Sequence, residues 1–347
     1  MKSAHKSAHP KRATLSDVAR EAGVGPMTVS RTINGHPYVA EETARRVREA
    51  IQKLDYRPNH AARILTGKLS RSIGLIVPDI SDTFFSIVSH AVQETARESG
   101  YLVWLAASGD DPTVEAAQVE MMTHHPVDGI LLVPADGRGH HLKTIVTGTI
   151  PIVTIDRPME VATTDSVGVE NRAGAQIAVD HLAQHGYQKI ACITANAHLV
   201  TIKERIAGYN ESMRRAKLQP LKVINLPGPE SAAHAIADLL ASPDRPDALF
   251  TANNAATIWV IEALKKLGIS MGDEIALLGF DDVDFFSLIT PSVTAIHQPA
   301  SELGNVSARL LLQRIHGELK TSSIRTILPV TLTIRESCGC RSTTTSD

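Results

Sequence analysis

Residues 14–35 read TLSDVAREAGVGPMTVSRTING, and their pattern predicts two short helices joined by a turn. Thr14 with Asp17 three residues later forms a capping-box pattern, which favours a helix start. Gly23 and Gly25 then interrupt the apolar periodicity, and Pro26 suits the first position of a second helix. Two short helices around a tight turn have the dimensions of a helix-turn-helix, whose second helix fits the major groove of DNA.

The exposed face of that second helix carries the side chains that could read DNA. Arg31 can make a bidentate contact to guanine, and the hydroxyls of Thr28 and Ser30 can donate to phosphates. A third helix is expected from Glu41, with acidic residues at its positive end. A small helical lid with surface hydroxyls is the alternative interpretation of the same pattern.

Charge is distributed unevenly along the chain, although the net charge is only −2. Residues 1–70 contain 13 of the 35 lysines and arginines but only 6 of the 37 aspartates and glutamates. A basic segment attached to an acidic body indicates that one end meets a polyanion. Chance clustering would give the same numbers, so charge alone does not distinguish polyanion binding from chance.

From Arg71 onward, short apolar runs alternate with amphipathic helical stretches. Alternation at this density predicts two α/β lobes, each a doubly wound parallel sheet with helices on both faces. The expected strands are residues 73–77, 102–106, 130–133, 152–155, 190–194, 248–251 and 275–280. The expected helices are residues 84–99, 114–123, 173–184, 206–216, 232–240 and 255–267.

Several classes of protein are disfavoured by composition. No stretch approaches the roughly 20 apolar residues of a membrane helix, and residues 1–12 lack the apolar core of a signal peptide, so we expect a cytoplasmic protein without a membrane partner. Three cysteines make no disulfide framework, and Cys338-Gly339-Cys340 lacks a second ligand pair, so no metal is expected. Without a Ser/His/Asp or Cys/His arrangement, we expect no catalytic residues, no cofactor and no enzymatic activity.

The order of these motifs resembles the lactose and galactose repressor (LacI-type) family of bacterial transcription regulators. In the first 35 residues the resemblance is carried by Asp17-Val18-Ala19, Ala22-Gly23-Val24, Thr28-Val29-Ser30-Arg31 and Asn34-Gly35. It continues through residues 54–59, 62–67, 73–78, 127–130, 165–169, 205–209, 279–282 and 335–340. The resemblance implies an all-α helix-turn-helix headpiece followed by two lobes like those of a periplasmic sugar-binding protein.

The resemblance also implies which residues contact DNA. Pro26, Met27 and Arg31 match base-reading positions, but Pro26 offers no donor and Gly25 replaces the usual hydroxyl cap, which leaves Arg31 as the main polar reader. Residues 59–65 resemble the family's hinge helix, and Leu65 matches its minor-groove wedge, whereas the pattern alone indicates a linker leucine packed on the core. The expected DNA-binding residues are Thr14, Leu15, Pro26, Met27, Thr28, Ser30, Arg31, Asn34, Asn59, Arg63 and Leu65.

Effector-binding residues are implied where strands end or helices begin, which is where open α/β sheets bind ligands. Phe84 and Phe85 could stack on a sugar ring or pack in the core, Trp259 is a weaker candidate, and Asn254 stands where many relatives have aspartate. A sugar or a sugar acid is the expected effector. The expected effector-binding residues are Phe84, Phe85, Asp156, Arg205, Asn253 and Asp281, with Arg205 opening its helix.

The domain organisation follows from these boundaries. We expect a leader (1–12), a headpiece (13–58), a hinge helix and linker (59–70), a two-lobed core (71–340) and a tail (341–347). The first lobe would comprise about 71–170 and 300–328, and the second about 171–298 and 330–340. The predicted function is an effector-controlled regulator, a repressor that binds a pseudo-palindromic operator as a homodimer. A transport-type sugar-binding protein and an α/β enzyme are the competing readings.

Overall fold

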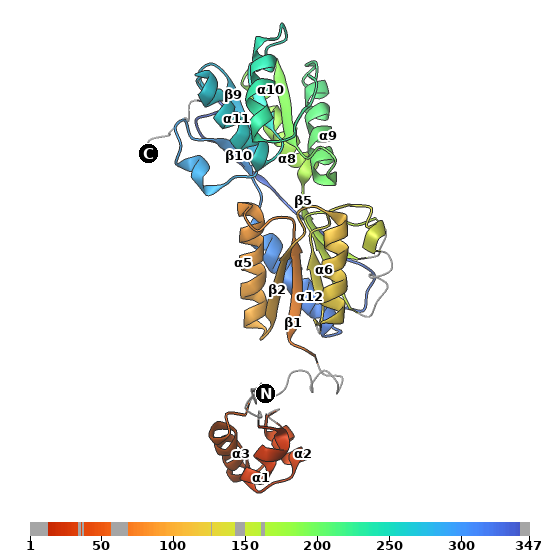
Figure 1. The fold of residues 1–347 in the computed structure, drawn as a ribbon. Coiled ribbons are helices and arrows are strands. Elements are labelled where there is room, and N and C mark those ends of the chain that lie inside the picture. Colours follow the sequence, from red (N-terminus) through yellow and green to blue (C-terminus); the bar gives the residue numbers. More distant parts are fainter. Residues whose placement is uncertain are drawn as a thin grey trace, which may run out of the picture. The chain divides into compact units, whose positions relative to one another are not determined.

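The computed structural model divides into two compact units, Met1–Ser70 and Arg71–Asp347 (Figure 1). The structure describes residues 13–33, 36, 38–56, 69–125, 127–142, 150–160 and 164–340. We call residues 13–56 the headpiece and residues 71–340 the two-lobed unit. The expected leader and tail lie outside the described residues, and so do four expected DNA contacts, namely Asn34, Asn59, Arg63 and Leu65.

The headpiece contains three helices, α1 (Leu15–Ala22), α2 (Pro26–Ile33) and α3 (Glu41–Lys53). The predicted capping box is present, because the Thr14 side chain accepts from Asp17 N while the Asp17 carboxylate accepts from Thr14 N. Gly23 ends α1 with a left-handed backbone (φ 64°), a conformation that glycine adopts at little cost. Apolar side chains of the three helices then form a small buried core that includes Val18, Val29 and Val47.

The first lobe is built on a six-stranded sheet in the order β11-β5-β4-β3-β1-β2, in which every strand pair is parallel. Successive residues of β1 serve opposite faces: Ile73 and Leu75 join the core cluster beneath α5 and α12, whereas Ile76 joins the cluster beneath α6. The elements are β1 (Ser72–Val77), α5 (Thr83–Glu98), β2 (Leu102–Ala107), α6 (Pro112–His124), β3 (Ile130–Leu132), η1 (His140–Leu142), β4 (Ile152–Ile155), β5 (Asp165–Val169), α12 (Ala300–Ile315) and β11 (Arg325–Leu328).

The second lobe repeats this layering on a six-stranded sheet in the order β12-β10-β9-β8-β6-β7. Its pairs are parallel except for β12, which runs antiparallel to β10. Helices α8 and α9 pack together beside the sheet, as do α10 and α11 (Figure 1). The elements are α8 (Asn171–Gln184), β6 (Ile190–Ala195), α9 (Val200–Arg215), β7 (Ile224–Leu226), α10 (Pro229–Ala241), β8 (Ala248–Thr251), α11 (Asn254–Leu267), β9 (Ala276–Phe280), η2 (Asp284–Ser287), β10 (Thr294–His297) and β12 (Thr331–Thr333).

The chain passes between the lobes more than once, near residues 170, 298 and 330. The strands that the apolar pattern did not predict are β5, β7, β10, β11 and β12, each of which is short and includes polar residues. Helix α9 begins at Val200, so the expectation that Arg205 opens this helix is wrong. No helix in the described part of the chain has the length and apolarity that crossing a membrane requires.

Candidate DNA-binding surface and effector cleft

Helix α2 exposes one face of the headpiece. Val29 is fully buried in the headpiece core, which orients the rest of the helix. Met27 is 67% exposed and Arg31 is exposed, while Thr28 and Ser30 are partly covered. Met27 and Arg31 are one turn apart, so they present an apolar group and a cation on the same side of the helix. A cation can bind a guanine edge, and an apolar group can contact a thymine methyl.

The start of α1 is held by a compact polar arrangement. Thr14 Oγ1 lies 2.6 Å from Asp17 Oδ2, and Arg20 Nη2 donates to Asp17 Oδ1 at 2.7 Å. The hydrogen bonds from Thr14 hold the pKa of the Asp17 carboxyl below its usual value. Thr14 therefore serves the helix as a cap in this structure, and its expected contact with DNA stays a prediction together with that of Leu15, which is half-buried.

Most basic residues of the headpiece are paired. Arg20, Arg48 and Lys53 form ion pairs with Asp17, Glu41 and Glu21 respectively. Arg31 makes no ion pair with any described residue. Its charge on α2 is therefore available to a polyanion without breaking a contact within the described headpiece.

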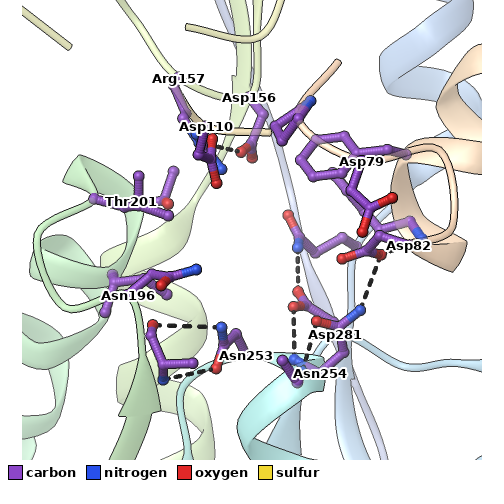
Figure 2. A pocket seen from close by; sticks show the side chains of 18 of the residues that line it. Asp79, Asp82, Asp110, Asp156, Arg157, Asn196, Thr201, Asn253, Asn254 and Asp281 are labelled. Atoms are coloured by element: carbon purple, nitrogen blue, oxygen red, sulfur yellow. Dashed lines mark hydrogen bonds and ion pairs between the residues drawn. The ribbon is translucent and has the colours of Figure 1, made fainter. Parts of the chain in front are cut away.

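A cleft of about 620 Å³ lies in the two-lobed unit where the carboxyl ends of strands from both sheets meet (Figure 2). This volume is in the usual range for a small-molecule site. The first lobe contributes the segments after β1, β2 and β4, and the second contributes those after β6, β8 and β9. Every effector-binding residue expected from the sequence lines this cleft: Phe84, Phe85, Asp156, Arg205, Asn253 and Asp281.

Asp156 and Arg157 follow β4 and are both buried. Asp156 has a left-handed backbone (φ 64°), and its Oδ1 atom is buried without a hydrogen-bond partner among the described residues. Burial raises the pKa of Asp156, an effect that Arg157 and Arg205 oppose. Arg157 donates to Asp110 and to Pro134 O. A buried acceptor without a partner at a strained residue indicates a position where a ligand donor would be bound.

Asp281 is the centre of a network on the second lobe. Its carboxylate accepts from Asn254 N (3.1 Å), from Arg205 Nη1 (3.4 Å) and from the Gln298 side chain. Arg205 also donates from Nε to Asn171 Oδ1 (2.8 Å) and lies 3.7 Å above the centre of the Phe280 ring. Arg205 reaches the cleft from the second turn of α9, not from a helix start, because its long side chain spans the distance that its backbone does not.

Asn253 and Asn254 play different parts at the start of α11. Asn253 is the N-cap and accepts from Ala256 N, and it also accepts from Ala195 N of β6. Asn254 Nδ2 donates to Asp82 Oδ1 at 3.0 Å, which joins the second lobe to the first across the cleft (Figure 2). Burial, with repulsion from Asp281, raises the pKa of Asp82. The amide at position 254 therefore supports a contact between the lobes that two carboxylates would oppose.

The aromatic residues of the cleft are half-buried or buried. Phe85 is 7% exposed and belongs to the core cluster, while Phe84 and Trp259 are half-buried and line the cleft. The rings of Phe84 and Phe85 meet edge to face at 5.2 Å. Phe85 therefore packs in the core and also lines the cleft. Phe84 is the more exposed of the two side chains.

The charge of the cleft was not foreseen from the sequence. Five aspartates line it against two arginines, and each arginine is already paired with an aspartate. Among the lining residues that sequence reasoning missed are Asp79, Asp82, Asp110, Arg157 and Gln298. Asp79, Asp110 and Arg157 closely follow strands β1, β2 and β4, so the rule about strand ends could have found them.

Comparison with known proteins adds independent information. Residues 14–59 match "Bacterial regulatory proteins, lacI family", and residues 179–338 match "Periplasmic binding protein-like domain". The transcriptional repressor PurR of Photobacterium profundum is 31% identical over 307 residues, which cover 87% of this chain and 92% of the relative. The transcriptional regulator PtxS of Pseudomonas aeruginosa is 33% identical over 331 residues, or 94% of this chain and 96% of the relative.

Two solved structures of regulators resemble this chain over most of its length. The lac repressor dimer bound to operator and the anti-inducer ONPF has a TM-score of 0.84 at 25% identity and covers 94% of this chain and 99% of its own. A complex of the transcriptional regulator CelR with cellobiose has a TM-score of 0.69 at 28% identity and covers 94% of this chain and 100% of its own. The chain belongs to the LacI family of bacterial regulatory proteins, and it is a DNA-binding transcription regulator.

Proposed function

We propose that this protein is a repressor whose affinity for a pseudo-palindromic operator is controlled by a neutral, polyhydroxylated effector in the cleft. The observation that carries the effector class is the charge of the lining, in which five aspartates face two arginines that are already paired. Carboxylates accept hydrogen bonds from sugar hydroxyls but repel another carboxylate or a phosphate. Of the two ligand classes that the sequence suggested, the neutral sugar is therefore favoured over the sugar acid.

On the DNA side, we propose that α2 lies in the major groove. Arg31 would bind a guanine edge, and Met27 would contact an apolar base edge beside it, since both are exposed on one face. Thr28 and Ser30 would bind phosphates. Residues 59–65, which lie outside the described residues, would act as a hinge helix with Arg63 and Leu65 in the minor groove.

A homodimer would present two headpieces to the two half-sites of the operator. The face that we propose for dimerisation includes β2, which is the edge strand of the first sheet. Leu102 is 70% exposed and Trp104 is 59% exposed, an apolar edge that proteins normally cover. Changing Trp104 to Glu should convert the dimer into a monomer in sedimentation equilibrium, and an unchanged dimer would place the interface elsewhere.

Effector control would follow from the contacts between the lobes. A ligand bound to Asp156 in one lobe and to Arg205 and Asp281 in the other favours one relative orientation of the lobes. The orientation would change how the hinge segments pair, so the affinities for effector and operator would depend on each other reciprocally. Because its partner is chromosomal DNA, the protein would act in the cytoplasm, by binding and not by turnover.

The test combines a ligand screen with a DNA titration. Thermal shift would compare each neutral sugar with its matched acid, such as glucose with gluconate and ribose with ribonate. A ligand that binds only the folded protein adds about 2.7 kcal/mol at 100 times its dissociation constant. Fluorescence anisotropy on DNA upstream of the protein's own gene, with and without the stabilising ligand, would then measure the coupling.

The effector class and the operator binding can be contradicted by separate results. Stronger stabilisation by the acids than by the neutral sugars would overturn the effector class and leave DNA binding untouched. Absence of sequence-specific binding to any genomic fragment, with and without ligand, would overturn the assignment of repressor. A ligand that shifts the melting temperature without altering operator affinity would contradict the proposed coupling.

A further inference from the structure

A cluster of two thiols and one imidazole lies in the second lobe, away from the strand ends that form the cleft. The ligand atoms of His181, Cys338 and Cys340 all lie within 4.8 Å of one another. His181 Nε2 lies 3.3 Å from Cys340 Sγ. His181 and Cys338 are buried, whereas Cys340 is partly exposed, so the cluster opens to solvent on one side only.

The polypeptide holds this cluster in place from several directions. His181 stands in the last turn of α8. Ser337, which precedes the first thiol, is bound to the sheet on both sides: its hydroxyl donates to Leu277 O at 2.6 Å and accepts from Thr294 N at 2.8 Å. Tyr187 donates from its hydroxyl to Cys338 O at 2.9 Å. The thiols are therefore positioned by the fold and not by a free chain end.

Gly339, between the two cysteines, makes the close approach possible. Its backbone is left-handed (φ 68°), and a Cβ atom there would lie 2.5 Å from Tyr187 Oη and 2.8 Å from Gly272 O. No other residue type fits without moving Tyr187 or the backbone at Gly272. The tight turn directs the two side chains of the Cys-Gly-Cys segment to one site beside His181.

The spacing of the three atoms matches the coordination of a thiophilic ion. With zinc–sulfur bonds of about 2.3 Å and zinc–nitrogen bonds of about 2.0 Å, a tetrahedral ion separates its ligand atoms by roughly 3.5 to 3.8 Å. With His181 Nε2 3.3 Å from Cys340 Sγ and all three ligand atoms within 4.8 Å of one another, only small side-chain adjustments are needed to reach those values. Thiolate and imidazole ligands together select zinc or cuprous ions over magnesium and calcium.

We propose that His181, Cys338 and Cys340 bind a zinc-class ion, with solvent at the fourth position, and that the ion fastens the chain after β12 to the end of α8. Binding replaces the two thiol protons, which are released to solvent, with two sulfur–metal bonds, and no atom is oxidised or reduced. A metal site was not expected from the sequence, because the third ligand lies 159 residues from Cys340 along the chain.

The experiment titrates the full-length, fully reduced and chelator-treated protein with Co²⁺, which takes the same coordination as zinc. Thiolate-to-cobalt charge-transfer absorption reports thiol ligands. The chain has fifteen histidines, but Co²⁺ bound by histidines alone gives no such absorption. We expect one equivalent of Co²⁺ to saturate the band and one equivalent of Zn²⁺ to abolish it. Zn²⁺ should also raise the melting temperature of the two-lobed unit.

Variants locate the site. Cys340→Ser should remove the band, and because Cys340 is partly exposed the variant should fold, which circular dichroism checks. His181→Gln removes one of the three ligands and should weaken binding by about tenfold or more. The matched control is Cys192→Ala: this third cysteine is buried in β6, where burial raises the pKa of its thiol to about 12, and its loss should leave the band unchanged.

Two results would overturn the proposal. One is a reduced, folded wild-type protein that gives no thiolate band with excess Co²⁺. The other is a band that survives Cys340→Ser undiminished. Mass spectrometry that finds a Cys338–Cys340 disulfide, in a protein whose reduced form gives no band, would show that the pair is a redox couple and not a metal site.

Discussion

The headpiece and the two-lobed unit arrange their candidate functional residues in opposite ways. In the headpiece, the described DNA-facing candidates of α2 stand within six consecutive residues, Pro26 to Arg31, on one side of a helix whose opposite side is the core. In the two-lobed unit, residues as distant as Asp82 and Asp281 meet in one cleft. On the headpiece surface, a single substitution should change DNA binding without disturbing other residues. In the cleft, a substitution leaves the hydrogen-bond partners of the lost side chain unsatisfied.

The largest effect is expected at the centre of the network. Arg205→Ala leaves the buried Asp281 and Asn171 without their cation, and breaking a buried pair from one side costs about 3–5 kcal/mol. Calorimetry should show a large drop in the melting temperature of the two-lobed unit, together with loss of the effector-induced shift. Arg172→Ala, at an exposed arginine of α8, is the control and should change little. Equal effects of the two would mean that Arg205 is no more than a surface charge.

On the headpiece surface, Arg31→Ala should act on DNA alone. Losing one base contact costs about 1–3 kcal/mol of discrimination between the operator and other sequences. The melting temperatures of both units should stay as they are, because Arg31 is exposed and makes no ion pair with described residues. Arg48→Ala, at an exposed arginine that is paired with Glu41, should leave the sequence preference unchanged in anisotropy titrations. Unchanged sequence preference in Arg31→Ala would contradict its role as a base reader.

A smaller effect is expected where the headpiece depends on its own local structure. Thr14→Ala removes the side-chain cap of α1, which costs about 1 kcal/mol of headpiece stability. Thr14→Ser keeps the hydroxyl and should retain most of that stability in chemical denaturation. If both variants behave like the wild type, the capping box contributes nothing measurable and Thr14 is free to act on DNA.

The smallest effect is a difference in the pH dependence of the two-lobed unit. Burial and the neighbouring Asp281 raise the pKa of Asp82, so ionising this carboxyl costs stability at neutral pH. Asp82→Asn removes that cost, keeps a side-chain acceptor and should melt higher than the wild type at pH 7. The advantage should shrink as the pH falls through the raised pKa and vanish below 3.8, the usual value for an aspartate.

Asp111 provides the control of opposite sign. Hydrogen bonds from Thr113 N and Val114 N lower the pKa of its carboxyl at the start of α6. The ionised form is therefore favoured in the folded protein, and Asp111→Asn should melt lower than the wild type at neutral pH. A melting curve in which both variants shift in the same direction would show that the charge of Asp82 is not what the substitution changed.

Much of the fold could be predicted because its signals are local. Helix α2 begins at Pro26, and α1 ends where Gly23 interrupts the apolar periodicity, as the sequence indicated. The strands that escaped prediction, such as β5 with Asp165 and Ser166, take their stability from neighbours on both sides of the sheet and not from an apolar run. The cleft was predicted in place but not in charge, because Asp82 and Gln298 enter it only through the packing of two lobes.

From the residues alone it was possible to predict where α1 and α2 begin, how strands and helices alternate in the two-lobed unit and which family the chain resembles, since capping, periodicity and turns act over a few residues. Which side chains share a site could be seen only once the sheets had brought distant segments together. The tertiary structure set Asn254 against Asp82 across the cleft, and it brought His181 to the thiols at the end of the described chain. The order of strands in a sheet brings together residues that are distant along the chain, and no local sequence pattern records that order.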